Sequence, residues 1–247
     1  MCNLKVFEIE NICYSYSDGT TALQDLSFSV KEGEILGIAG ANGSGKSTLL
    51  MIMMGCLVPF SGRVLYRGRL LDRDKIREMR RETGLLFQDP DDQLFLPSVW
   101  EDVAFGPRNL GADEDEVGSM VSAALDDAGI SCLANKAPWK LSGGEKTLAA
   151  LAGLFAMRPK TLLLDEPTSG LDPRSRREFI DVMRNKGRTA VIATHDLDMV
   201  LDLCSRVIIL ENGTLVSDGQ VPGVLTDEKF MRSCGLEIPL SCSGRFG

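Results

Sequence analysis

A run of aliphatic residues that ends in two adjacent carboxylates places the strongest constraint on the fold of this chain. Leucines occupy positions 162–164, and Asp165 and Glu166 follow them directly. An uninterrupted apolar run of this kind is typical of a strand covered on both faces, as in parallel sheets flanked by helices. Ligands of open α/β sheets bind outside the carboxyl ends of the strands. The run therefore predicts an α/β fold that carries both carboxylates to the ligand-binding edge of its sheet.

Other apolar runs extend this prediction to most of the chain. Runs that read as buried strands occur at 35–39, 85–87, 190–193 and 207–210, and helical patterns lie between several of them. Such alternation favours a largely parallel sheet. Residues 4–38 alternate between apolar and polar in places, which favours further strands there.

The middle of the chain has a different pattern. After Pro90 it reads as loop-rich, with Pro97, Gly106 and Pro107. Asp113 then has the position of a helix cap, and a second helix is expected to start at Ser142. We therefore expect a single domain over 1–247, divided into a catalytic core (1–89 and 159–220), an inserted helical part (90–158) and a short C-terminal extension (221–247) that ends in a frayed tail at 241–247.

Composition excludes several classes of protein. The chain has 247 residues, of which 44% are apolar and 25% charged, as expected for a soluble globular protein. The net charge of −8 argues against a general nucleic-acid binder, which needs a basic face. The seven scattered cysteines indicate reduced thiols in a cytoplasmic protein and no metal cluster. No secretory leader is recognisable, and the longest uncharged stretch, 47–62, is too short and too interrupted to span a membrane.

A glycine-rich segment at 40–47 has the spacing of a phosphate-binding loop, G-x-x-x-x-G-K-S/T. It lies between a predicted strand and a helical pattern, where the backbone N–H groups of the loop and of the helix start face a phosphate. In this arrangement Lys46 reaches the β- and γ-phosphates and the Ser47 hydroxyl is a ligand for Mg²⁺. An ordinary glycine-rich turn is the alternative. The segment reads Gly40, Ala41, Asn42, Gly43, Ser44, Gly45, Lys46 and Ser47.

Four side chains at predicted strand ends are expected to meet this loop. Asp165 is suited to hold Mg²⁺ through water, and Glu166, one residue further on, is suited to orient an attacking water. Gln88 ends the run at 85–87 and offers a neutral oxygen to Mg²⁺ or water. His195, the only histidine, follows the run at 190–193 and is expected to contact the γ-phosphate. Solvated acids and a structural histidine are the alternatives.

Two more features are consistent with nucleotide binding. Ser142 and Glu145 have the spacing of a capping box, and the glycines between them, Gly143 and Gly144, leave the helix start open to an anion. Tyr14 and Tyr16 share one face of a predicted strand. One of the two tyrosines is expected to stack on a base, whereas ordinary strand packing is the alternative.

Taken together, these motifs resemble the nucleotide-binding subunit of ATP-binding cassette (ABC) transporters over about residues 4–220, with LSGGE at 141–145 as the family signature. The resemblance implies an α/β P-loop NTPase (RecA-like) core with an antiparallel β subdomain and an inserted α-helical subdomain. It implies Mg²⁺-dependent ATP hydrolysis, with Glu166 as catalytic glutamate, His195 as switch histidine, and Lys46 and Gln88 as further catalytic residues. It further implies nucleotide contacts from Lys46, Gln88 and the residues Tyr16, Gly40, Asn42, Gly43, Ser44, Gly45, Ser47, Thr48, Ser142, Gly143, Gly144, Glu145, Asp165 and Asp172, the last in the D-loop.

The same resemblance implies a dimer, homo- or hetero-, in which the phosphate loop of each subunit faces the signature of the other. A narrower similarity, at 87–95 and 99–107, is to the ATPases of energy-coupling factor importers for cobalt, nickel or vitamins. These ATPases work at the cytoplasmic face of the membrane with a transmembrane coupling protein and a substrate-specific membrane subunit. The segment after Gln88 is then the expected docking groove, and no nucleic-acid partner is expected.

Two alternatives and two departures from the family pattern bear on this interpretation. A soluble cassette ATPase of iron–sulfur cluster assembly is the main alternative, because its signature also tends to read LSGGEK, as here at 141–146. DNA-repair and ribosome-acting cassettes are disfavoured, because they typically need two cassettes per chain or a long coiled-coil insert, and this sequence has neither. The sequence departs from the family in having Glu145 where glutamine is usual, and its C-terminal extension is short for the importer subfamily.

Overall fold

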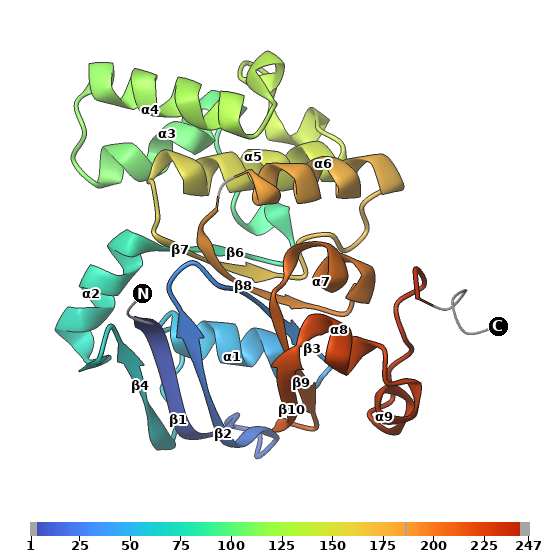
Figure 1. The fold of residues 1–247 in the computed structure, drawn as a ribbon. Helices are drawn as coiled ribbons and strands as arrows, with labels where there is room; N and C mark the ends of the chain where they lie inside the picture. Colours follow the sequence, from blue (N-terminus) through green and yellow to red (C-terminus); the bar gives the residue numbers. More distant parts are fainter. Residues whose placement is uncertain (1–3, 186, 243–247) are drawn as a thin grey trace.

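The computed structural model describes residues 4–185 and 187–242 and contains two sheets and a group of helices (Figure 1). The smaller sheet is antiparallel, in the order β2-β1-β4-β5. Its strands are β1 (Lys5–Ser15), β2 (Thr21–Lys31), β4 (Ser61–Tyr66) and β5 (Arg69–Leu70).

The larger sheet has the order β10-β9-β3-β8-β7-β6 and is parallel except for β10, which pairs antiparallel with β9 at one edge. Because its parallel strands share one direction, their carboxyl ends share one edge, and the phosphate loop and the acidic pair follow two of these ends. The strands are β3 (Ile35–Ala39), β6 (Thr83–Leu86), β7 (Thr161–Asp165), β8 (Thr189–Thr194), β9 (Arg206–Glu211) and β10 (Thr214–Gln220).

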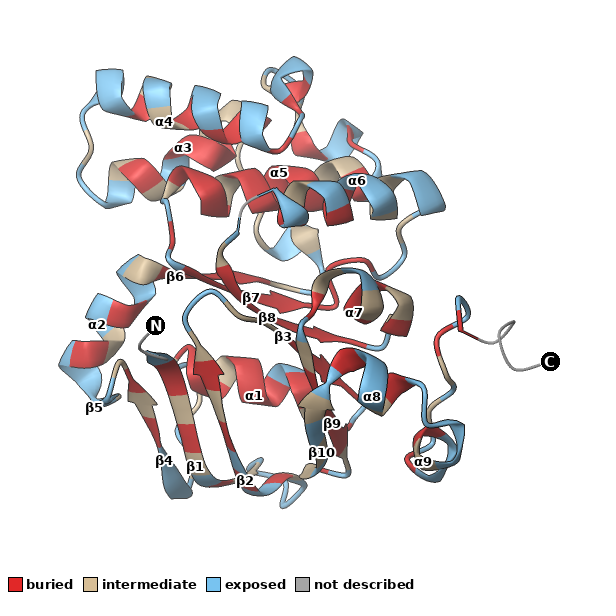
Figure 2. Cartoon of the chain, in the orientation of Figure 1, coloured by how far each residue is buried: buried red, intermediate tan, exposed pale blue. Residues whose placement is uncertain are grey.

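The two faces of the larger sheet line two separate apolar cores, because successive side chains of a strand point to opposite faces. On one face Leu163 and Val191 pack with helix α1 (Lys46–Met53) and with the smaller sheet. On the other face Leu162 and Leu164 pack in a core with the helices that follow β6 in the chain. Burial on both faces explains the uninterrupted apolar runs of β7 and β8, which are almost wholly buried (Figure 2).

Three helices between β6 and β7 form the inserted helical part. They are α3 (Val99–Asn109), α4 (Glu114–Asp127) and α5 (Gly143–Ala156), with short 3₁₀ turns η1 (Pro90–Asp92), η2 (Ser131–Leu133) and η3 (Pro138–Lys140). Asp113 and Ser142 cap α4 and α5 with complete capping boxes, as the sequence predicts. The helical part stacks over the large sheet (Figure 1).

Helix α3 corrects the expectation of a loop-rich segment after Pro90. Ser98 caps α3, and Pro107 lies in its last turn. Gly106 is also tolerated in this helix because it faces Met157, where a Cβ would lie 2.6 Å from the Met157 side chain. Gly106 therefore reflects close packing between helices, and Pro107 marks the end of a helix. Neither residue indicates a loop.

The remaining helices are α2 (Arg73–Glu82), α6 (Pro173–Arg184), α7 (Leu197–Leu203), α8 (Val221–Leu225) and α9 (Glu228–Ser233). The expected frayed tail at 241–247 is wrong at its start, because the backbone N–H groups of Leu240 and Ser241 donate to the Asp198 carboxylate at 3.1 and 3.0 Å. Its last part, 243–247, lies outside the described residues. Among the described helices, none is long and apolar enough to cross a bilayer.

Candidate functional site

Close packing shapes the loop between β3 and α1. A Cβ at Gly40 would lie 2.4 Å from the Leu210 carbonyl oxygen, and one at Gly45 would lie 2.6 Å from the Ala22 carbonyl oxygen. Gly45 also has a φ of +103°, which side-chain-bearing residues rarely adopt. The loop therefore needs glycine at both positions. Its fixed course brings the unpaired N–H groups of the first turn of α1 to the edge of the sheet.

Lys46 is the first residue of α1 and is almost fully buried. Its Nζ donates to the carbonyl oxygens of Gly40 and Ala41 at 2.9 and 3.2 Å. The same Nζ lies 3.3 Å from Oε1 of Glu166. The ammonium group is thus held at the phosphate loop by acceptors that a phosphate can replace.

Asp165 ends β7 and is 6% exposed. Its Oδ1 has no hydrogen-bond partner among the described residues. Burial raises the pKa of Asp165, opposed by a hydrogen bond with Ser47, and Glu166 raises it further, opposed by Lys46. A buried carboxylate with an unpartnered oxygen beside a serine hydroxyl is an incomplete oxygen-ligand set, as a hard cation such as Mg²⁺ requires.

The Glu166 carboxylate is fixed more tightly. Its Oε2 accepts from the Thr194 hydroxyl at 3.0 Å, from the backbone N–H of His195 at 3.1 Å and from His195 Nδ1 at 2.8 Å. The backbone of Glu166 has a φ of +45°, an uncommon conformation for glutamate. This conformation turns the chain sharply at the end of β7, and the hydrogen bonds to β8 and the loop after it hold the carboxylate in place.

His195 contributes both to this anchoring and to an exposed polar face. Because an ionised carboxylate only accepts hydrogen bonds, Nδ1 carries the proton toward Glu166. The ring is 56% exposed, so Nε2 remains available to a ligand. The hydrogen bond at Nδ1 fixes the orientation in which Nε2 is offered.

Most of the expected residues line one cavity of about 480 Å³ above the sheet edge. Tyr16 borders it and shares a hydrogen bond of 2.7 Å with Thr48, while the Tyr14 ring packs edge-on against Tyr16 at 5.1 Å. Tyr16, not Tyr14, is therefore the tyrosine available for stacking. The expected residues in the lining are Tyr16, Asn42, Gly43, Gly45, Lys46, Ser47, Thr48, Gln88, Glu166 and His195.

The signature residues lie elsewhere, in the helical part. None of residues 142–145, all of them described, lines the cavity. Oε2 of Glu145 accepts from the Ser142 backbone N–H at 2.8 Å, which lowers the pKa of Glu145. The carboxylate at the unusual position is thus occupied in capping α5. Asp172 also lies outside the cavity lining and caps α6.

Sequence reasoning missed two groups of residues. The first is part of the cavity lining, at Thr20, Thr21 and Ala22. The second is a polar cluster behind His195, in which Arg176 donates to both oxygens of Asp196, at 2.6 and 2.9 Å, and Thr168 donates to the same carboxylate at 3.1 Å. Asp196 also caps α7. The cluster joins α6, α7 and the loop after Glu166, and no local pattern reveals it.

The fold and the cavity together define a class. A phosphate loop between a buried parallel strand and a helix, with an acidic pair at the end of a nearby strand, is the arrangement of P-loop NTPases. Residues 23–169 match the sequence profile of the ABC transporter family, and the chain belongs to that family. It is an ABC-type ATPase, as the motifs predict.

Individual relatives agree with this assignment. The chain is 45% identical to a putative ABC transporter ATP-binding protein of Geobacter sulfurreducens, over 97% of this chain and 96% of the relative. It is 41% identical to the energy-coupling factor transporter ATP-binding protein EcfA1 of Methanospirillum hungatei, over 96% and 87%. Among solved structures, CbiO1 from Clostridium perfringens, part of the ABC transporter complex CbiONQ, superimposes with a TM-score of 0.84 at 40% identity, covering 93% of this chain and 94% of that one. The narrower resemblance to energy-coupling factor ATPases is thereby confirmed.

Proposed function

We propose that this chain hydrolyses Mg·ATP to drive an energy-coupling factor importer, as one of two ATPase subunits at the cytoplasmic face of the membrane. The observation that carries this proposal is the position of Glu166. Its carboxylate lies between Lys46 of the phosphate loop and His195, and backbone and side-chain donors fix it at the cavity. A carboxylate held in this way is suited to orient a water molecule against a bound triphosphate.

The chain's own groups divide the remaining work. Lys46 exchanges the carbonyl oxygens of Gly40 and Ala41 for phosphate oxygens, and the N–H groups of the loop complete the phosphate contacts. His195 offers Nε2 to the γ-phosphate while its Nδ1–H stays on Glu166. Tyr16 supplies the ring for the base. Charge stabilisation and positioning provide most of the rate in such a reaction.

The residues present fit a magnesium ion. Asp165, with its orphaned buried oxygen, and Ser47 would hold it, with Gln88 as a further oxygen donor. When bound, the ion would offset the negative charge of the phosphates. Among the described residues there is no cluster of three or more histidine, cysteine or acidic side chains that could hold a metal. This agrees with Mg²⁺, which keeps several waters and uses few protein ligands.

We propose that the active form is a dimer, because each chain carries two halves of a site that do not meet within it. The phosphate loop lines the cavity, whereas the start of α5 at Ser142, Gly143 and Gly144 lies in the helical part. A second copy or a similar subunit, placed head to tail, supplies its own Ser142 to this cavity. Asp172, at the start of α6, belongs to the same contact surface.

The proposed membrane partner docks in an apolar groove of about 390 Å³ between the segment after Gln88 and helices α3 and α5. Phe95 and Phe105 form its outer wall, 62% and 46% exposed, with their rings in edge-to-face contact at 5.3 Å. Asp92 and Asp102 add acidic groups to the lining. Exposed aromatic residues beside carboxylates fit an amphipathic helix that carries a basic residue.

CbiO1 belongs to a CbiONQ complex and EcfA1 is named for an energy-coupling factor transporter. These names support an importer with a coupling protein and a substrate-specific subunit, and a cobalt, nickel or vitamin cargo. The iron–sulfur assembly alternative is not favoured, because the relatives above carry transporter names and the groove offers a membrane-subunit contact.

Glu166→Gln tests the hydrolytic role. The variant should bind ATP with little change in Kd, lose ATP turnover by several orders of magnitude and accumulate as an ATP-bound dimer in gel filtration. Turnover near the wild-type rate would refute the assignment of Glu166.

The groove is tested separately by Phe95→Ser with Phe105→Ser, measured as co-purification with the membrane subunits encoded beside this chain. The double variant should lose them and keep its basal ATPase rate. Trp139→Ser is the matched control, since Trp139 is 69% exposed and lies outside the groove lining. Equal loss of partners in both variants, or in neither, would contradict the proposed docking site.

A further inference from the structure

Helix α2 carries a basic arc that the ATPase site does not use. At about 100° per residue, Arg80, Arg73, Arg77 and Arg81 follow one another over roughly 100° of the helix surface. All four are exposed. The opposite face of α2, with Lys75 and Met79, is buried. The arginines are thus a continuous exposed surface of the helix and not part of its packing.

Three of these arginines lack partners. Among the described residues, Arg73, Arg77 and Arg81 have no ion pair or hydrogen bond. Their spacing of four residues places like charges next to each other, which destabilises an isolated helix. Of the carboxylates on α2, Glu78 pairs with Lys75 at 2.7 Å and Glu82 accepts from Tyr66 at 2.7 Å, while Asp74 lies in the first turn of the helix. In a chain with a net charge of −8, this predominantly basic surface indicates an anionic ligand.

An apolar depression adjoins the basic arc. It has a volume of about 190 Å³, and Ile76 of α2 lines it together with Val58 and Leu70. Val58 is 81% exposed and Leu70 is 56% exposed. Arg80 joins the two surfaces, because its guanidinium donates to the carbonyl oxygens of Met54 and Gly55 at 3.0 and 3.2 Å. Exposed aliphatic side chains beside unpaired arginines are the composition of a surface that rests on a lipid interface.

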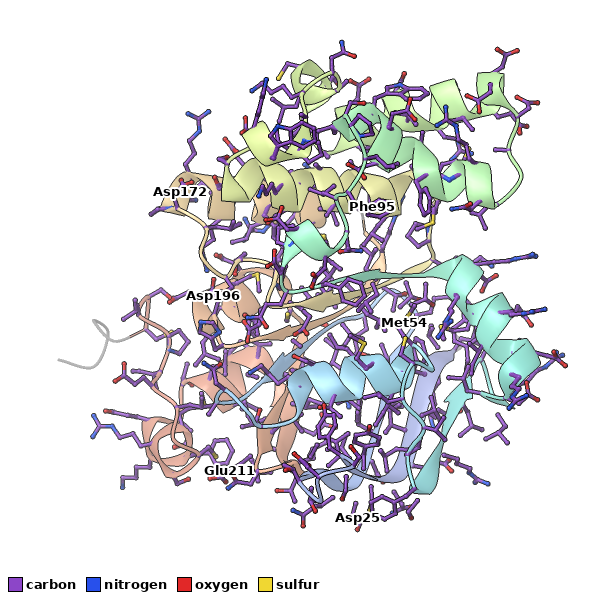
Figure 3. All side chains as sticks on the ribbon, turned by 180° about the vertical axis from the view of Figure 1, so that it is seen from behind. Asp25, Met54, Phe95, Asp172, Asp196 and Glu211 are labelled. Carbon is purple, nitrogen blue, oxygen red and sulfur yellow. The ribbon has the colours of Figure 1, made fainter. Side chains whose placement is uncertain are left out.

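The arc lies on the same side of the molecule as the proposed docking groove. Figure 1 shows α2 on the side where α3 and α5 end, and the groove is lined there by Asn109 and Met157. Figure 3 shows Met54, which contacts Arg80, on the same half of the molecule as Phe95, with Asp172 and Asp196 on the other half. A chain docked through the groove would therefore carry α2 on the side of its membrane partner.

We propose that the arc of Arg73, Arg77, Arg80 and Arg81, with Val58 and Leu70 beside it, contacts the phosphate groups of anionic lipids at the membrane surface. The direction that the arc faces depends on the proposed docking groove. Its attraction for phosphate groups depends only on the arginines of α2. Nucleic acid fits less well, because the surface offers aliphatic side chains where single strands need aromatic stacking and because the rest of the chain is acidic.

The test is sedimentation of the full-length protein with vesicles of phosphatidylglycerol and phosphatidylcholine, compared with vesicles of phosphatidylcholine alone. Each arginine near an anionic surface contributes about fivefold to partitioning, so Arg77→Gln with Arg81→Gln should weaken binding about 25-fold. The matched control is Lys229→Gln with Arg232→Gln, which removes the same charge from exposed positions on α9, at the far end of the molecule (Figure 1). Added salt should weaken wild-type binding.

Equal binding to both kinds of vesicle, or an equal loss in the control variant, would overturn the proposal. If no vesicle binding occurs and the Arg77 and Arg81 variant instead loses its membrane subunits, the arc contacts an acidic protein surface and the lipid assignment is wrong. Thermal unfolding and basal ATPase rate are measured in parallel. Their preservation in a variant that loses vesicle binding separates this inference from the ATPase function.

Discussion

Replacing Asp165 by asparagine should stabilise the ligand-free protein while removing its response to Mg·ATP. Burial raises the pKa of Asp165 in the folded state, and one of its carboxylate oxygens has no hydrogen-bond partner in the part of the chain that the structure describes. A carboxyl group with a raised pKa binds its proton more tightly when folded. It therefore lowers stability as pH rises from about 3.9, the unfolded value, and the cost is complete once the pH exceeds the folded value.

The size of the effect follows from the contacts. An unpartnered buried acceptor costs about 1–3 kcal/mol. Ser47 and Lys46 offset part of this cost by favouring the ionised form. We therefore expect asparagine to add about 1 kcal/mol, which is roughly 2–4 °C in Tm for a chain of this length.

The assay is thermal unfolding at neutral pH, with a chelator and then with Mg²⁺ and a non-hydrolysable ATP analogue. At a ligand concentration a hundredfold above Kd, the free energy of unfolding of the wild type should rise by about 2.7 kcal/mol. For the variant, the rise with Mg²⁺ and nucleotide should be no larger than the rise with nucleotide and chelator. Asp196→Asn is the control of opposite sign. Burial raises the pKa of Asp196, but hydrogen bonds from Arg176 and the backbone outweigh burial and lower it, so its removal should reduce Tm. A lower Tm for Asp165→Asn, or a full Mg²⁺-dependent shift, would refute the reasoning.

Three further changes give distinct outcomes. Glu145→Gln keeps the capping acceptor, so Tm should move by less than about 2 °C, while loss of a negative charge near the partner's phosphates should tighten ATP-driven dimerisation, measured by light scattering. Arg176→Met should cost about 2 kcal/mol at neutral pH by urea unfolding. The lowered pKa of Asp196 gives stability that is lost as pH falls through the folded value, so this deficit should shrink below pH of about 4, and a constant deficit would contradict the pairing. Gln93→Leu removes the hydrogen bonds that the Gln93 side chain makes to the Phe87 N–H and to the Leu85 carbonyl. It should lower both Tm and the stimulation of the ATPase rate by the membrane subunits. If Tm falls and the stimulation is unchanged, Gln93 has a structural role only.

Local chemistry made much of the fold and site predictable. The strand before Asp165 is apolar because both of its faces are covered, and Ser142 and Asp113 cap helices through contacts three residues away. The phosphate loop is equally local, since its glycines, its lysine and the helix that follows are adjacent in sequence. Such features are encoded in short stretches of sequence. The parallel sheet then brings the residues at its strand ends together at one edge.

What could not be predicted depends on contacts between distant segments. Helix α3 was hidden because Gly106 and Pro107 look like breakers until the Met157 side chain is placed against the glycine. The Arg176–Asp196 pair joins residues that no periodicity connects. The φ of Glu166 also has no sequence signal, because glutamate does not favour that conformation and the hydrogen bonds from Thr194 and His195 hold the side chain there.

The segment after Gln88 is attached to both of the parts that it joins. On the sheet side, Gln93 accepts from the Phe87 N–H at 3.0 Å and donates to the Leu85 carbonyl at 2.9 Å, both half-buried hydrogen bonds next to Gln88. On the helical side, the backbone N–H groups of Phe95 and Leu96 donate to the Asp102 carboxylate of α3, both at 3.0 Å, and an exposed ion pair of 2.7 Å joins Asp91 to Lys146. Exposed pairs of this kind contribute about 0–1 kcal/mol and open readily. A partner bound in the proposed groove would therefore contact a segment that half-buried hydrogen bonds hold on both sides, next to Gln88 and at Asp102 of α3. We expect a shift of this segment to move the sheet edge at Gln88 and helix α3 together.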